Sequence, residues 1–169
     1  FTREGQYPIA TPNPEMLVAA SSHPEFRAVL QHAALNIPDG YGLILASRFL
    51  GTPLPERVSG VDLLTKLCAK TDAQVFFLGA APGVAERAAA GLKEKNPQLS
   101  IAGIYAGSPS VSEEDAIVAR INASGATMLF VAYGAPAQDL WIARNLERMP
   151  KLRVAMGVGG SFDFLVGVQ

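Results

Sequence analysis

The stretch Gln74-Val75-Phe76-Phe77-Leu78-Gly79-Ala80-Ala81-Pro82-Gly83-Val84 indicates the fold class of this chain of 169 residues. Its first five residues are almost continuously apolar, which predicts a strand at 74–78 that is covered on both faces. The two glycines that follow predict a tight turn, and residues 84–95 have the pattern of a helix. A strand, a short turn and a helix form the repeating unit of a parallel α/β sheet.

The same unit extends along the chain in both directions. Further strands are expected at residues 7–11, 35–37, 101–105, 128–133 and 153–157. Further helices are expected at 14–20, from Pro24 onward, and at 41–50, 60–70, 112–123 and 138–148, with Asn13, Ser59 and Ser112 as N-caps. We therefore predict the α/β class, with a Rossmann-like, mostly parallel sheet, helices on both faces and a single domain over residues 1–169.

Composition limits the possible functions. The chain is 49% hydrophobic and 17% charged, which fits a folded domain. Its net charge of −1 creates no positive electrostatic field that would attract nucleic acid, so no nucleic-acid partner is expected. The single cysteine, Cys68, lies in an apolar-periodic stretch and is expected to be a packed thiol in a reducing compartment. The pattern around His23 and His32 does not suggest a metal pair, so no metal site and no cofactor are expected.

The helix expected at 41–50 is apolar on nearly all sides. A helix of this kind is usually buried, so it is predicted to be central in the fold. It could also serve an interface in a homo-oligomer.

In a parallel sheet, ligands bind at the carboxyl ends of the strands. Asp39 follows such an end, in Ile37-Pro38-Asp39-Gly40-Tyr41-Gly42, and it is the only carboxylate between Glu25 and Glu56. Our hypothesis is that Asp39 is a catalytic base in a cleft. The alternative is that Asp39 only caps the helix at 41–50.

Other strand ends carry glycine. The turn from Gly79 to Gly83 is either a tight βα turn or a cradle for a diphosphate, and residues 97–105 lack the acidic side chain that an NAD site requires. Tyr105 precedes Gly107 and could stack on a base or fill the edge of the sheet. Gly134 allows close approach of a ligand.

Gln138 carries a donor and an acceptor, which suit a uracil edge or a sugar hydroxyl, although it could simply begin a helix. Gly159 and Gly160 offer a backbone surface to a ligand, and Asp163 could hold a ribose hydroxyl or cap the next helix. Arg57 is a candidate for binding phosphate, with a surface salt bridge as the alternative.

Five motifs follow one another in order: Thr11-Pro12-Asn13-Pro14-Glu15, Pro38-Asp39-Gly40-x-Gly42, Pro55-Glu56-Arg57-Val58-x-Gly60-x-Asp62, Gly134-x-Pro136-x-Gln138 and Gly157-x-Gly159-Gly160-x-Phe162-Asp163-x-x-x-Gly167. Together they resemble the WecG/TagA/CpsF glycosyltransferase family, from about Tyr7 to Gly167. The resemblance implies an inverting hexosyltransferase of the TagA-like kind. Such enzymes move N-acetylmannosamine, or a related sugar, from UDP to a polyprenyl-diphosphate-linked N-acetylglucosamine during synthesis of wall teichoic acid-type polymers.

The resemblance also implies roles for single residues and a place in the cell. The position of Asp39 is the proposed general base, Thr11 and Asn13 line the same pocket, and positions matching Arg57 and Gln138 matter for activity. The resemblance further implies a cytoplasmic enzyme, peripheral on the inner face of the plasma membrane. A basic C-terminal tail that attaches family members to the membrane is absent after Gly167, which suggests a truncated, poorly active core.

Two other functions remain open on the sequence. One is an oxidoreductase or a methyltransferase that uses the turn at 79–83. The other is a non-catalytic module that binds UDP, for which the loss of Asp39 would have no consequence.

Overall fold

The computed structural model describes residues 5–167. The chain ends on which the expectation of a truncated protein rests, residues 1–4 and 168–169, lie outside the described residues. The strands are β1 (Tyr7–Ala10), β2 (Leu35–Asn36), β3 (Gln74–Gly79), β4 (Ser100–Tyr105), β5 (Met128–Ala132) and β6 (Val154–Gly157). The helices are α1 (Pro14–Ser22), α2 (Pro24–His32), α3 (Tyr41–Phe49), α4 (Gly60–Lys70), α5 (Val84–Lys95), α6 (Val111–Ser124), α7 (Ala137–Asn145) and α8 (Ser161–Leu165).

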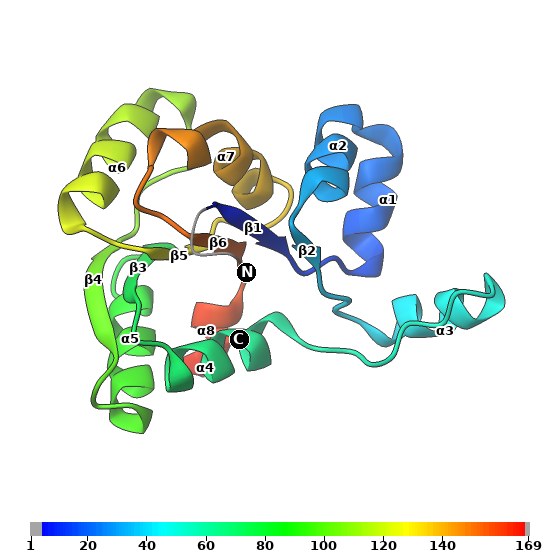
Figure 1. The fold of residues 1–169 in the computed structure, drawn as a ribbon, viewed down its shortest axis with the longest axis horizontal. Coiled ribbons are helices and arrows are strands. Elements are labelled where there is room, and N and C mark those ends of the chain that lie inside the picture. The colour runs from blue at the N-terminus through cyan, green and yellow to red at the C-terminus, as the bar shows by residue number, and fades with distance from the viewer. Residues whose placement is uncertain (1–4, 168–169) are drawn as a thin grey trace.

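The six strands form one sheet in the order β2-β1-β6-β5-β3-β4. Every neighbouring pair is parallel. Helices α6 and α7 cover one face of the sheet, and α4, α5 and α8 cover the other (Figure 1). The predicted α/β class, with a parallel sheet between two layers of helices, is therefore confirmed.

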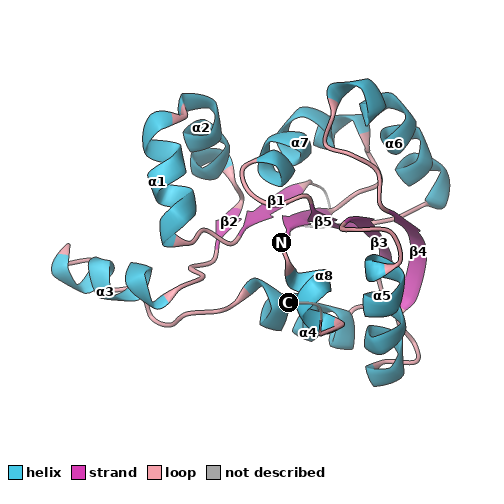
Figure 2. Cartoon of the chain, turned by 180° about the vertical axis from the view of Figure 1, so that it is seen from behind, coloured by secondary structure: helices cyan, strands magenta, loops and turns pink. Residues whose placement is uncertain are grey.

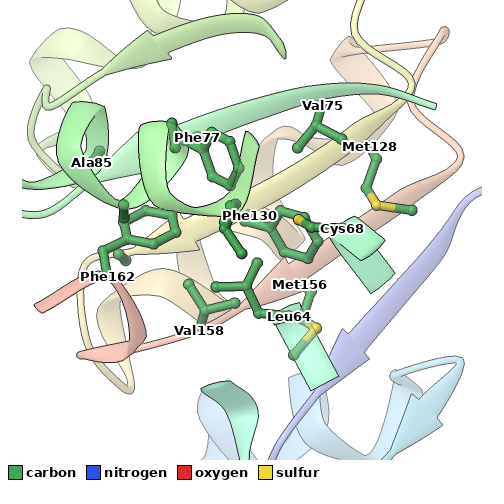
Figure 3. Close-up of a cluster of buried hydrophobic side chains, with 14 of the residues drawn as sticks. Leu64, Cys68, Val75, Phe77, Ala85, Met128, Phe130, Met156, Val158 and Phe162 are labelled. Atoms are coloured by element: carbon green, nitrogen blue, oxygen red, sulfur yellow. The ribbon is translucent and has the colours of Figure 1, made fainter. Parts of the chain in front are cut away.

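The central strands are apolar throughout because each face of the sheet has its own core. In β3, Val75 and Phe77 point into the core with α4, α5 and α8, whereas Phe76 and Leu78 point into the core with α6 and α7. Figure 3 shows the first of these cores, in which the ring of Phe77 packs edge-on against Phe162 with centroids 5.3 Å apart. The strand sequences show no alternation of polar and apolar residues because both faces of the sheet are buried.

Cys68 lies in the same core, with 1% of its surface exposed. Burial raises the pKa of its thiol to about 12, so the thiol stays protonated at neutral pH. The predicted packed thiol is confirmed.

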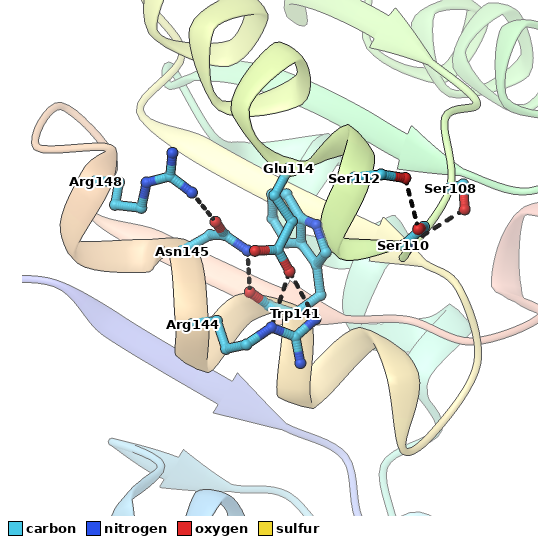
Figure 4. A network of polar contacts seen from close by, with 8 residues as sticks. All are labelled: Ser108, Ser110, Ser112, Glu114, Trp141, Arg144, Asn145 and Arg148. Atoms are coloured by element: carbon cyan, nitrogen blue, oxygen red, sulfur yellow. Dashed lines mark hydrogen bonds and ion pairs between the residues drawn. The ribbon is translucent and has the colours of Figure 1, made fainter.

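On the face of the sheet opposite to Cys68, polar contacts join α6 to α7. The guanidinium of Arg144 binds Glu114, with Nη2 2.7 Å from Oε1, and Glu114 is buried. Arg148 binds Asp115. It also donates to the side-chain oxygen of Asn145 (Figure 4). These contacts fix α7, whose first turn reaches the site described below.

Three local predictions about helices were wrong. The N-cap residue of α6 is Ser110, not Ser112, and its hydroxyl makes no capping hydrogen bond but lies 2.9 Å from the hydroxyl of Ser112 (Figure 4). The helix predicted at 138–148 ends as an α-helix at Asn145 and continues as a 3₁₀ turn. Asp163 does not cap α8, because that helix already begins at Ser161.

The prediction that the helix at 41–50 is central was also wrong. Helix α3 extends away from the body of the protein, joined to it by loops on both sides (Figure 2). Tyr41 is 75% exposed and Phe49 is 83% exposed. An apolar sequence predicts burial only where a partner surface exists, and the position of α3 in this chain leaves most of its surface open. Among residues 5–167, no helix is long and apolar enough to cross a membrane.

Candidate active site

A cavity of about 300 Å³ lies at the carboxyl ends of β1, β2 and β6. Strand β1 pairs with both other strands, so the loops that follow all three meet at one edge of the sheet. The starts of α4, α7 and α8 complete the walls. The residues lining the cavity include Thr11, Asn13, Asp39, Ser59, Gly60, Gln138, Gly159, Gly160, Ser161 and Phe164.

The carboxylate of Asp39 is held at the start of α4. Its Oδ2 accepts a hydrogen bond from the backbone N–H of Gly60 at 3.0 Å. The first N–H groups of a helix lack partners within the helix and carry positive charge, so a carboxylate is favoured at this place. Helix α3, by contrast, has no side-chain cap, and the alternative that Asp39 caps it is therefore wrong.

Three polar side chains converge around Gly60. A methyl group added there would lie 3.5 Å from Ser161 Oγ, 3.6 Å from Thr11 Oγ1 and 3.9 Å from Asp39 Oδ2. Thr11 follows β1, Asp39 follows β2, and Ser161 begins α8 after β6. Only the fold brings these three side chains together. Thr11 and Ser161 are buried, whereas the Asp39 side chain is 30% exposed and can reach a ligand.

Arg57 lies beside the carboxylate. Its Nε is 3.5 Å from Asp39 Oδ1, and its guanidinium lies over the ring of Tyr41, 5.2 Å from the ring centroid. The Arg57 side chain is 35% exposed, and a pair this exposed contributes little to stability. Its guanidinium therefore keeps donors that a phosphate could use.

Two side chains of the cavity wall also organise the backbone around it. Asn13 caps α1 as predicted, because its Oδ1 accepts from the N–H of Met16 at 2.8 Å. Gln138 is buried, and its Oε1 accepts from the N–H of Gly159 at 2.9 Å. The start of α7 is thereby tied to the glycine turn after β6.

Close packing explains why Gly157 is a glycine. A methyl group at Gly157 would lie 2.6 Å from Nε2 of Gln138, so the amide side chain rests directly on the backbone of β6. The glycine-rich sequence at 157–160 thus serves two purposes: Gly157 makes room for Gln138, and Gly159 with Gly160 lines the cavity.

Comparison with known proteins identifies the family. The family model described as "Glycosyl transferase WecG/TagA/CpsF family" matches residues 1–169. The chain belongs to the WecG/TagA/CpsF glycosyltransferase family. The resemblance carried by the five motifs is therefore confirmed.

Two curated relatives of this chain carry the same name, N-acetylglucosaminyldiphosphoundecaprenol N-acetyl-beta-D-mannosaminyltransferase. The relative from Bacillus spizizenii is 38% identical over 162 residues, which cover 94% of this chain and 62% of the relative. The relative from Staphylococcus aureus is 32% identical over 164 residues, which cover 95% of this chain and 63% of the relative. The chain thus spans less than two thirds of the length of these glycosyltransferases.

Five of the predicted site residues do not line the cavity: Arg57, Gly79, Gly107, Gly134 and Asp163. Arg57 is connected to the cavity only through its contact with Asp39. Gly79 has a φ of +99°, and a methyl group there would lie 2.7 Å from the carbonyl oxygen of Ala132 in β5. Gly107 follows β4, the strand at the far edge of the sheet, and a methyl group there would lie 2.8 Å from the hydroxyl of Tyr133. Close packing, against the backbone of β5 at Gly79 and against surrounding side chains at Gly107, therefore accounts for both glycines.

Gly134 and Asp163 are sequence neighbours of residues that line the cavity. Gly134 precedes Ala135, and Asp163 precedes Phe164. The ring of Tyr105 is covered by the guanidinium of Arg120, 4.3 Å from its centroid, and packs against the core with α6 and α7. This arrangement favours the interpretation that Tyr105 fills the edge of the sheet.

Sequence reasoning missed Ser161, Phe164 and the backbone of Gly60 as parts of the site. Gly60 stood within a family motif, which was an available signal. Ser161 carried none, because a serine after two glycines is common at the start of a helix. Within residues 5–167, no group of three or more His, Cys, Asp or Glu side chains is placed to hold a metal ion.

Proposed function

We propose that this chain is the core domain of an inverting hexosyltransferase. It transfers N-acetylmannosamine, or a related sugar, from a UDP-sugar to N-acetylglucosamine linked to undecaprenyl diphosphate. The observation that carries the proposal is the position of Asp39, whose partly exposed carboxylate borders the same cavity as Gln138 and the turn of Gly159 and Gly160. The names of the two relatives specify this acceptor and this sugar for those proteins.

In the proposed reaction Asp39 is the general base. It removes the proton from a hydroxyl group of the acceptor while the hydroxyl oxygen forms a bond to the anomeric carbon of the donor. The bond between that carbon and the phosphate oxygen breaks, and UDP leaves with the bonding electrons. Inversion follows when the acceptor attacks the face opposite to UDP, so the base and the diphosphate belong on opposite sides of the sugar.

The diphosphate would be held by groups on the wall of the cavity. The N–H of Gly60 is taken by Asp39, so the backbone of Gly160, in the turn after β6, is the candidate for holding the diphosphate. The guanidinium of Arg57, beside Asp39, has further donors that could reach the diphosphate, and Thr11 and Asn13 line the cavity. Oε1 of Gln138 is bound to Gly159 and its Nε2 packs on Gly157, so Gln138 would act on the uracil or the sugar by holding the glycine turn in place.

The proposed place of action is the inner face of the plasma membrane, where a nucleotide sugar meets a lipid-linked acceptor in the synthesis of a cell-surface polymer. The alternative of an NAD-dependent or methyl-transferring enzyme rests on the turn from Gly79 to Gly83. That turn contributes no residue to the cavity, and Gly79 is accounted for by its contact with β5.

The proposal is tested with the whole protein, UDP-N-acetylmannosamine and an N-acetylglucosamine diphosphate that carries a short lipid. We expect release of UDP that depends on the acceptor, and formation of a β-linked disaccharide detected by NMR. Thermal-shift measurements should show stabilisation by UDP and none by NAD or S-adenosylmethionine. Binding of UDP without any transfer would leave only a nucleotide-binding module and would contradict the proposed reaction.

A further inference from the structure

A second cavity, of about 510 Å³, lies between α1, α2 and the base of α3. Its walls are mostly leucine, alanine and proline, including Leu17, Leu30, Leu43, Leu50 and Leu54. Leu17 and Leu50 are 48% and 78% exposed, so the cavity is open to solvent along an apolar rim. An open apolar surface of this kind usually marks a binding site.

Three of the polar side chains on its walls are bonded to the backbone, and the other two, Gln31 and Thr52, lie at exposed positions. Arg27 donates to the carbonyl oxygens of Ala20 and Ser21 at 3.0 and 2.6 Å. Asn36 donates to Leu30, and Ser47 donates to Ile44 while it accepts from the N–H of Leu54. These groups are already paired, so the cavity suits an uncharged, apolar ligand.

The apolar cavity and the candidate active site share two segments of chain. Pro12 lines the apolar cavity, and its neighbours Thr11 and Asn13 line the active site. Pro38 also lines the apolar cavity and directly precedes Asp39. A ligand in the apolar cavity would therefore end close to the proposed catalytic base.

Helix α3 forms the outer wall of this cavity and stands away from the rest of the protein (Figure 2). A helix of nine residues is short for independent stability in water, and α3 exposes Tyr41, Leu45 and Phe49. An apolar ligand in the cavity would contact Leu43 and Leu50 of the α3 segment together with α1. Such a ligand would supply the packing that the helix lacks.

We propose that this cavity binds the isoprenoid chain of the lipid-linked acceptor, in the part of the chain next to the diphosphate. The inference rests on the proposed function for the presence of that acceptor, and the names of the relatives specify an undecaprenol-linked substrate for them. The match in chemistry is an apolar chain against walls that are mostly leucine, alanine and proline. The isoprenoid chain is attached to the sugar diphosphate, which explains why the cavity adjoins Asp39. The cavity is thus a specificity site for the acceptor lipid.

The test uses two acceptors with the same sugar diphosphate, one carrying a farnesyl chain and the other an ethyl group. The variant Leu17→Gln/Leu50→Gln changes two exposed positions on the rim, so the fold is expected to survive. We expect KM for the farnesyl acceptor to rise about tenfold, because apolar contact is lost, while KM for the ethyl acceptor and for the UDP-sugar is unchanged. Equal KM values of wild-type protein for the two acceptors would overturn the inference and leave the proposed transfer intact.

Two controls separate other uses of this surface. Phe49→Gln alters an exposed side chain of α3 that does not line the cavity, and Val111→Gln alters an exposed side chain at the start of α6. Neither should change KM for the farnesyl acceptor. A larger effect from Phe49→Gln than from the double variant would assign α3 to a membrane surface. A dimer in analytical ultracentrifugation that the double variant converts to a monomer would assign the cavity to a second copy of the chain.

A measurement without catalysis separates this inference from the proposed function. Farnesyl phosphate is titrated into protein with labelled leucine methyl groups and followed by NMR. Shifts at Leu17, Leu43 and Leu50 that disappear in the double variant support the cavity even if no transfer is found. Shifts confined to residues near Asp39, or no shifts at all, would overturn it.

Discussion

The carboxylate of Asp39 accepts a hydrogen bond from the backbone N–H of Gly60 at 3.0 Å, although 21 positions separate the two residues. The bond joins the loop after β2 to the first turn of α4. It holds one carboxylate oxygen in place, while the other lies 3.5 Å from Nε of Arg57. The position of the proposed base is thus set by a helix start and an arginine that follow it in the chain.

Asp39→Asn should abolish most of the activity with little change in structure. The amide oxygen can still accept from Gly60, but the side chain can no longer take a proton from the acceptor. We expect kcat to fall at least about 100-fold, with UDP affinity retained, because general-base catalysis contributes on the order of 10²–10⁴. Steady-state kinetics and calorimetric titration with UDP measure the two quantities.

Asp62→Asn is the matched control for that variant. Asp62 lies in the first turn of the same helix, where it accepts from the hydroxyl of Ser59 at 2.6 Å. It does not line the cavity, so we expect full activity and only a small loss of stability. Normal turnover by Asp39→Asn would place the base elsewhere.

Gln138→Ala should weaken binding of the donor. The variant removes the bond to the N–H of Gly159 and leaves a gap above Gly157. We expect KM for the UDP-sugar to rise about tenfold, because one buried hydrogen bond and the shape of the glycine turn are lost together. Gln98→Ala, at an exposed position after α5, is the control and should behave as wild type. An unchanged KM in Gln138→Ala would remove Gln138 from the proposed donor site.

Gly79→Ala should destabilise the protein more than Gly83→Ala. Both glycines have positive φ, but only at Gly79 would the new methyl group meet backbone, 2.7 Å from the carbonyl oxygen of Ala132. We expect a loss of about 3 kcal/mol or more at Gly79. At Gly83, where the methyl group meets nothing within 4 Å, left-handed strain alone should cost about 1–2 kcal/mol. Urea denaturation measures both losses.

The same pair of variants tests the alternative role of this turn. A diphosphate cradle at the start of α5 would make Gly83→Ala raise KM for the UDP-sugar. We expect no change in KM, because the turn does not line the cavity.

Asp139→Asn should remove a pH dependence of stability. Burial raises the pKa of Asp139 from 3.8 to about 6, opposed by hydrogen bonds from its own backbone N–H and from Gln138. The charged form is therefore disfavoured in the folded protein above about pH 6. As the pH falls from about 6 to about 4, the folded state takes up a proton before the unfolded state does, and this penalty is relieved.

The size of that effect follows from the two pKa values. A rise from 3.8 to about 6 corresponds to at most roughly 3 kcal/mol. The unfolding free energy of wild type, measured relative to Asp139→Asn, should increase by up to this amount between pH 7 and pH 4. Asp72→Asn, which removes a carboxylate at an exposed position, should show little of this difference. Parallel pH profiles for wild type and Asp139→Asn would contradict the prediction.

Much of the fold could be predicted because it depends on local patterns. The apolar run at 74–78 predicted a strand buried on both faces, and Asn13 and Ser59 were identified as caps because their hydrogen bonds span only three residues. Helix α3 was misplaced for the opposite reason. Its apolar residues predicted burial, but burial depends on where the connecting loops carry the helix.

The candidate site divides in the same way. By itself, the sequence determined the chemistry that each strand end offers: a lone carboxylate at Asp39, an amide at Gln138 and glycines at 157–160. Only the tertiary structure decided which ends meet. The order β2-β1-β6-β5-β3-β4 brings the ends of β1, β2 and β6 together and leaves Gly107 at the far edge, because strand pairing joins segments more than a hundred residues apart that no local pattern relates.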